Sequence, residues 1–186
     1  HASSEVKKIE KNNFIKQPSI NKRWGMYAKL FAIYEDQLNI TASIRTLERF
    51  FEELKTVNKK TSLPSQSLIA ELRTKLLERY LWSKRWSDVI NRYQEFEQTP
   101  GALSVYDKAI IAIAFEEADL SDKAQTILEK NQLVAQIKTI KLKNADVAHR
   151  IFEMNAKNDA MQNEVRQNNE DFAELTTVPK FSLGFY

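Results

Sequence analysis

Residues 68–130 read LIAELRTKLLERYLWSKRWSDVINRYQEFEQTPGALSVYDKAIIAIAFEEADLSDKAQTILEK and contain one pattern twice. Apolar residues of the first half recur 34 residues later, so that Leu77 corresponds to Ile111 and Tyr80 to Ala114. Two amphipathic stretches separated by a polar break, repeated at this spacing, are typical of stacked helical hairpins rather than of an enzyme core. The sequence therefore predicts two consecutive helical hairpins.

A third copy of the pattern lies upstream. Phe31 and Tyr34 lie 46 residues before Leu77 and Tyr80. The 12 additional residues fit a polar segment rich in Ser, Thr and Lys between residues 55 and 67, which we expect to form a loop. Three hairpins are therefore predicted over residues 24–131. The alternative is an ordinary helical bundle in which the spacing is coincidental.

On this pattern the chain resembles the tetratricopeptide family over about half of its length. The last repeat fits best, with the large and small pair Ile111 and Ala112, the aromatic Phe115 and the small Ala124. The middle repeat departs from the family because Glu78 stands where a small residue is expected, and no repeat ends in the family's proline. The resemblance implies a right-handed α-solenoid whose concave surface binds a peptide or helix of a protein partner.

A second resemblance leads to a different alternative. Leu72, Arg73, Leu77 and Trp86 look like the superhelical region of soluble lytic transglycosylases, whereas nothing in the chain looks like their catalytic domain. This resemblance implies a non-catalytic part of a cell-wall enzyme system.

Composition favours an all-α fold and gives little support for catalysis. Only 3 of the 186 residues are Gly and 4 are Pro, which indicates few turns and long helices. No Cys is present, so disulfides, thiolate metal sites and Cys nucleophiles are excluded. His149 and Glu153 provide two metal ligands on one helix face, but two ligands do not make a metal site. We expect no enzyme activity, no cofactor and no metal.

The longest uncharged apolar run, Ala109 to Phe115, is far shorter than the ~20 residues of a membrane-spanning helix. We therefore expect no membrane span. The chain begins with His1 rather than Met, which indicates either a removed targeting segment, for the periplasm or the mitochondrial matrix, or a cloning boundary. The compartment stays open.

Basic residues mark the N-terminal segment and the first long loop. Residues 1–23 carry six Lys or Arg against two Glu and predict a basic, flexible arm. Lys55, Lys59 and Lys60 make the predicted loop basic, and insertions between repeats usually lie on one binding face. These residues are candidate partner contacts. An organellar RNA-binding helical-repeat protein is the alternative that they suggest.

Two groups of aromatic residues are candidates either for ligand contact or for the core. Trp82, Lys84 and Arg85 lie where one helix ends and the next begins, so they could stack on a ligand through cation–π contacts. The alternative places Trp82 at the helix end and uses the neighbouring Trp86 to fill the gap between hairpins. A stripe of aromatic residues upstream is predicted to be core: Tyr27, Phe31 and Tyr34.

The pattern changes after residue 131, where residues 132–177 predict a long C-terminal helix. Apolar and Asn residues follow the alternating spacing of a coiled-coil seam at Ile140, Asn144, Val147, Ile151, Met154, Asn158, Met161, Val165, Asn168, Phe172 and Leu175. This segment predicts either packing back on the solenoid or weak self-association through residues 140–175. Charges beside the seam would favour antiparallel copies, with Lys143 and Arg150 opposite Asp171 and Glu164.

Residues 178–186 predict an extended aromatic tail. Its candidate partner contacts are Phe181, Leu183, Phe185 and Tyr186, which either dock on the protein's own surface or enter a partner's groove.

Together these patterns predict an all-α right-handed α-solenoid of about three helical hairpins, followed by a long C-terminal helix. The predicted function is a protein–protein interaction scaffold or assembly factor.

Overall fold

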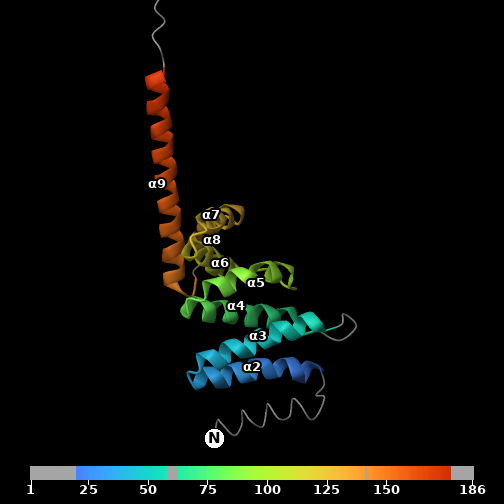
Figure 1. Cartoon of the computed structure of the whole chain (residues 1–186). Helices are drawn as coiled ribbons and strands as arrows, with labels where there is room; N and C mark the ends of the chain where they lie inside the picture. The colour runs from blue at the N-terminus through green and yellow to red at the C-terminus, as the bar shows by residue number, and fades with distance from the viewer. Residues whose placement is uncertain (1–19, 58–62, 141, 177–186) are drawn as a thin grey trace, which may run out of the picture.

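The computed structural model describes residues 20–57, 63–140 and 142–176. Within these ranges, side chains are described only between residues 22 and 170. These residues form eight α-helices and no strand (Figure 1). The helices are α2 (Ile20–Asp36), α3 (Ile40–Thr56), α4 (Gln66–Trp82), α5 (Trp86–Gln98), α6 (Val105–Glu117), α7 (Ser121–Lys130), α8 (Leu133–Thr139) and α9 (Ala145–Thr176). The all-α prediction is confirmed.

The first six of these helices pair into three hairpins, α2–α3, α4–α5 and α6–α7. Each hairpin packs on the next, because α3 contacts α4 and α6 contacts both α4 and α5. Figure 1 shows the hairpins following one another along one direction, with α2 and α3 at one end and α7 at the other. The predicted arm overlaps this stack, since α2 already includes Lys22 and Arg23.

The same turn closes all three hairpins. Leu38, Lys84 and Asp119 adopt left-handed φ angles of 54°, 52° and 58°. The N–H of the residue after each of them donates to the carbonyl five residues earlier, on Tyr34, Tyr80 and Phe115, at 2.8, 2.9 and 2.9 Å. This is the Schellman arrangement, which satisfies the free carbonyls at a helix end. Three equivalent turns support the predicted repetition of one hairpin unit.

These turns correct the predicted spacing of the last two hairpins. Tyr34 corresponds to Tyr80, as the 46-residue offset predicts, but Tyr80 corresponds to Phe115 and the offset is 35 rather than 34. The buried Val89 and Ala124 share the 35-residue offset. The error arose because residues 109–115 are all apolar, so a shift by one residue still matches apolar with apolar positions.

A buried ion pair fixes the connection between the second and third hairpins. The fully buried Arg73 donates to the carbonyls of Gly101 and Ala102 at 2.9 and 2.8 Å, and its Nε lies 3.6 Å from Asp107. Asp107 also forms a capping box with Ser104 at the start of α6. A charge buried with partners of this kind holds neighbouring elements in one geometry.

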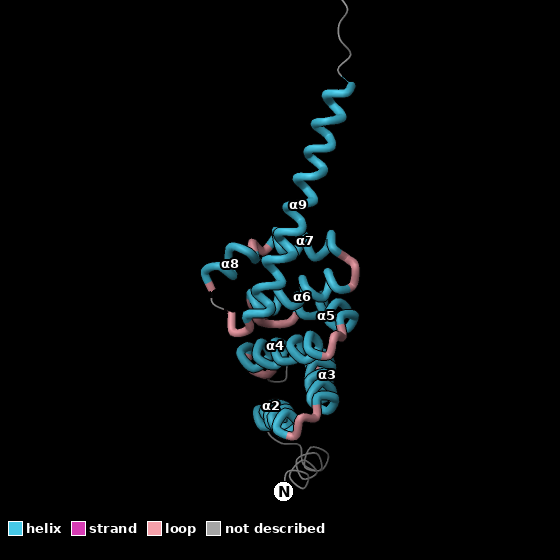
Figure 2. Tube along the Cα trace, turned by 90° about the vertical axis from the view of Figure 1, so that its left-hand side faces the viewer, coloured by secondary structure: helices cyan, strands magenta, loops and turns pink. Residues whose placement is uncertain are grey.

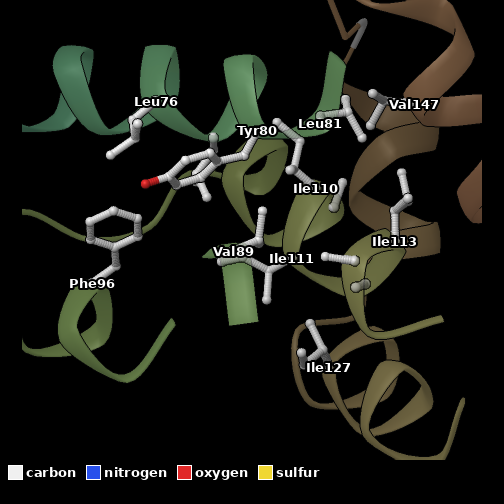
Figure 3. Packing of buried hydrophobic residues seen from close by; sticks show 14 of the residues in the cluster. Leu76, Tyr80, Leu81, Val89, Phe96, Ile110, Ile111, Ile113, Ile127 and Val147 are labelled. Atoms are coloured by element: carbon white, nitrogen blue, oxygen red, sulfur yellow. The ribbon is translucent and has the colours of Figure 1, made fainter. Parts of the chain in front are cut away.

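Helix α6 is buried on every side, and residues 109–114 have no exposed surface. The hairpin helices cover part of it, while α8 and α9 cover the rest. Figure 3 shows Val147 on α9 facing Leu81 on α4, with Ile110 and Ile113 nearby. An apolar sequence all round the helix is the expected signature of such burial.

The C-terminal segment is not one helix from residue 132. It breaks between α8 and α9, where Ile140 is extended and Asn144 accepts the N–H groups of Asp146 and Val147 at 3.0 and 3.4 Å. An Asn side chain that satisfies these free donors starts a helix, so the predicted seam positions at Ile140 and Asn144 lie outside α9. The long helix itself is confirmed from Ala145 to Thr176.

Helix α9 has two unlike halves, which we name the docked half (145–158) and the projecting half (159–176). In the docked half, Val147 and Ile151 are buried. In the projecting half, every residue from 159 to 170 is exposed, and Met161 and Val165 retain 58% and 59% of their accessible surface. Figures 1 and 2 show this half extending beyond the hairpins.

Candidate protein-interaction surfaces

A groove of about 640 Å³ lies between α2 and α3, in the first hairpin. Its wall on α2 consists of residues spaced four, three and four apart, which places them on one helix face. Its wall on α3 follows a second face that points away from the core. The lining residues are Arg23, Tyr27, Leu30, Tyr34, Ala42, Arg45, Thr46, Arg49, Glu52 and Glu53.

The floor of the groove is aromatic. Tyr27 packs against Trp24 and against the edge of Phe50, with ring centroids 6.3 and 5.5 Å apart. The Tyr27 hydroxyl donates to Glu53, and burial together with this carboxylate raises the pKa of Tyr27 well above its usual value. Tyr27 therefore stays neutral at physiological pH. The predicted aromatic core stripe is only partly correct, because Tyr27 and Tyr34 are half-buried and line the groove, whereas Phe31 is core.

Two arginines give the groove an unbalanced positive charge. Arg23 forms an ion pair with Glu53, and Glu52 is held by Lys55 and Arg92 at 3.2 and 3.0 Å. Arg45 and Arg49 are exposed one helical turn apart, and neither makes an ion pair within the part of the chain that the structure describes. The carboxylates of the groove are thus engaged, while two guanidinium groups remain available to a ligand.

The predicted aromatic and cationic contacts lie at the turn of the second hairpin. Trp82 is 56% exposed, and the guanidinium of Arg79 covers its ring at 4.1 Å. Lys84 occupies the left-handed position of the turn. Arg85 lies over the Tyr80 ring and pairs with Glu48 at 3.0 Å and with Asp88 at 2.6 Å. The structure brings Trp82, Lys84 and Arg85 together, but residues of the chain itself already engage Trp82 and Arg85.

Of the remaining predicted contacts, the structure describes only Lys55. Lys55 lies in the last turn of α3 rather than in a loop, and it pairs with Glu95 at 2.9 Å and with Glu52. The hydrogen bond that Lys55 donates to Glu95 is the main reason that the pKa of Lys55 is raised. Outside the described residues lie Lys59, Lys60, Phe181, Leu183, Phe185 and Tyr186.

Sequence patterns did not identify Arg45 and Arg49. Both fall on the solvent side of an amphipathic helix, where charged residues are ordinary. Only the packing of α2 beside this side of α3 makes the two arginines part of a groove.

Comparison of the chain with protein-family models, curated proteins and solved structures finds no match. Within residues 20–57, 63–140 and 142–176, no group of three metal-ligating side chains occurs. No helix in the same ranges is both long and apolar enough to span a bilayer.

Proposed function

We propose that this protein is an interaction scaffold or assembly factor, built as a right-handed α-solenoid of three tetratricopeptide-like hairpins and extended by α9. The equivalent Schellman turns at Leu38, Lys84 and Asp119 support a repeated hairpin unit. Repeat architectures of this kind present extended surfaces to peptides and helices. The proposed binding site is the groove between α2 and α3.

The observation that carries this proposal is the pair of unengaged arginines beside an aromatic floor. A guanidinium group binds a carboxylate through two parallel hydrogen bonds, and such charge-assisted bonds are stronger than neutral ones. The half-buried Tyr27 and Tyr34 supply apolar surface next to Arg45 and Arg49. The groove therefore suits a partner segment that carries carboxylates beside apolar side chains, in the manner of a helix in a groove.

Affinity purification of the native protein, followed by mass spectrometry, tests this function. The parent chain is compared with an Arg45→Glu/Arg49→Glu variant and with a matched control, Lys29→Glu/Lys130→Glu, which makes the same charge change at exposed positions outside the groove. We expect a protein partner that the parent and the control retain and that the groove variant loses. Titration with the purified partner should then show binding that weakens as salt increases.

The outcome also separates protein from RNA binding. Lys55, one of the residues that suggested RNA binding, is engaged by Glu95 and Glu52. Salt-sensitive retention of RNA by the parent, lost in the groove variant, would replace the protein partner with RNA. Equal retention of every partner by the groove variant would refute the groove as the binding site.

A further inference from the structure

From residue 159 to residue 170, the projecting half of α9 is exposed and packs on no other helix that the structure describes. An isolated helix of this length is marginally stable in water, and most helical stability comes from packing an apolar face. Met161 and Val165 lie one turn apart on the same side and are more than half exposed. This half of α9 is therefore built to pack against another surface.

The projecting half is also strongly acidic. Residues 159–176 contain five acidic residues and one basic residue, so their net charge is −4. Arg166 lies 3.4 Å from Glu170, which neutralises it within the helix. Glu164 lies beside Val165 and makes no ion pair with any residue that the structure describes. The helix thus presents apolar side chains flanked by a free carboxylate.

Arg150, one of the charges that would favour antiparallel pairing of two α9 helices, is already engaged. Arg150 pairs with Glu117, and Lys157 lies 3.0 Å from Glu116. Two projecting halves placed side by side would bring together only like-charged segments, which repel one another. The predicted antiparallel self-association would have to break the ion pair between Arg150 and Glu117.

We propose that the projecting half of α9 from one copy of this chain docks in the α2–α3 groove of another copy. The groove offers Arg45 and Arg49 beside Tyr27 and Tyr34, and the helix offers Glu164 beside Met161 and Val165. Docking would therefore place a carboxylate against guanidinium groups and apolar side chains against apolar side chains. This inference rests on the proposed function of the groove and names its occupant.

A chain does not fill its own groove in this way. The groove belongs to the first hairpin, at one end of the stack, and the projecting half leaves the stack at the opposite end (Figure 1). Because donor and acceptor surfaces differ, the contact is heterologous. Such contacts continue from copy to copy and produce chains or closed rings, the smallest of which is a dimer in which each copy fills the other's groove.

Sedimentation of the parent and of two full-length variants tests this assembly. The groove variant is Arg45→Glu/Arg49→Glu, and the helix variant is Met161→Asp/Val165→Asp. The parent should form dimers or larger species as its concentration rises. Each variant alone should remain monomeric, because one of its two surfaces is blocked. An equal mixture should form a dimer and nothing larger, since only one productive contact remains.

The altered residues of both variants are exposed, so both should fold like the parent. Circular dichroism melting checks this. Lys29→Glu/Lys130→Glu is the charge control and should assemble like the parent. A parent that stays monomeric at every concentration overturns the inference, as does a mixture that stays monomeric or a helix variant that still assembles. If the parent is monomeric but its groove still binds a separate protein, the proposed function survives and only its occupant changes.

Discussion

The docked and projecting halves of α9 belong to one continuous helix and follow one seam, yet their surroundings differ completely. Ile151 has no exposed surface, whereas Val165, two heptads later, retains 59% of its surface. The docked half covers α6, and its cations pair with Glu116 and Glu117 at the end of that helix. A repeating apolar pattern thus establishes which face of a helix will pack, but not whether its packing partner belongs to the same chain.

Truncation gives the largest expected difference between the halves. Ending the chain after Asn131 removes α8 and the docked half and exposes α6. Each uncovered apolar side chain costs about 1.5–3 kcal/mol, a large share of the about 5–15 kcal/mol that stabilises a typical domain. We expect the cooperative melting transition to be lost or strongly lowered. Ending the chain after Asn158 should leave the transition of the monomer unchanged, and a large drop there would contradict the division into halves.

A buried charge distinguishes the halves by point mutation. Ile151→Asp places a carboxylate in a fully buried site with no partner, which should destabilise the protein by about 3–5 kcal/mol. The matched Val165→Asp change is exposed and should alter stability by less than about 0.5 kcal/mol. Urea unfolding at a concentration where the chain is monomeric measures both. Similar losses for the two variants would show that the projecting half also packs within the monomer.

The start of the docked half depends on a single cap. Asn144→Ala removes the acceptor for the N–H groups of Asp146 and Val147, and it should cost about 1 kcal/mol. Asn144→Asp keeps an acceptor and serves as the control. A lower urea midpoint for the Ala variant alone would identify the cap as the cause, whereas equal midpoints would show that packing alone holds this helix end.

The ion pair between Glu116 on α6 and Lys157 on the docked half should give the smallest effect on stability, and this effect depends on pH. Burial of Glu116 opposes its ionisation, but hydrogen bonds from Lys157 and Ser121 outweigh burial and lower the pKa of Glu116 below its usual 4.5. A lowered pKa in the folded state stabilises the protein above pH 4.5, and this contribution is lost as the pH falls below that value. Lys157→Gln should reduce stability at pH 7 by at most about 1 kcal/mol and remove this part of the acid dependence. Melting temperatures compared at pH 7 and pH 3 would reveal it, and an unchanged difference between the two pH values would exclude the pair as a stabilising contact.

Part of the groove was predictable and part was not. The stripe of Tyr27, Phe31 and Tyr34 is visible in the sequence, but burial separates Phe31 from the two tyrosines only when α3 and α4 pack on α2. Arg45 and Arg49 follow ordinary amphipathic spacing and carry no signal of their own. The prediction that Trp82, Lys84 and Arg85 lie at one turn is correct. However, Arg79 covers the Trp82 ring, and Arg85 forms ion pairs with Glu48 and Asp88.

The sequence by itself determined that the chain is helical, that three hairpins lie in about residues 24–131, and that a long helix follows. These features are local, because helix propensity, turn geometry and apolar periodicity depend on residues a few positions apart. Only the tertiary structure decided the 35-residue offset of the last hairpins, the break at Asn144, the burial of α6 and the division of α9. Each of these depends on contacts between residues far apart in the chain, where many apolar surfaces are chemically equivalent and only the packed arrangement distinguishes them.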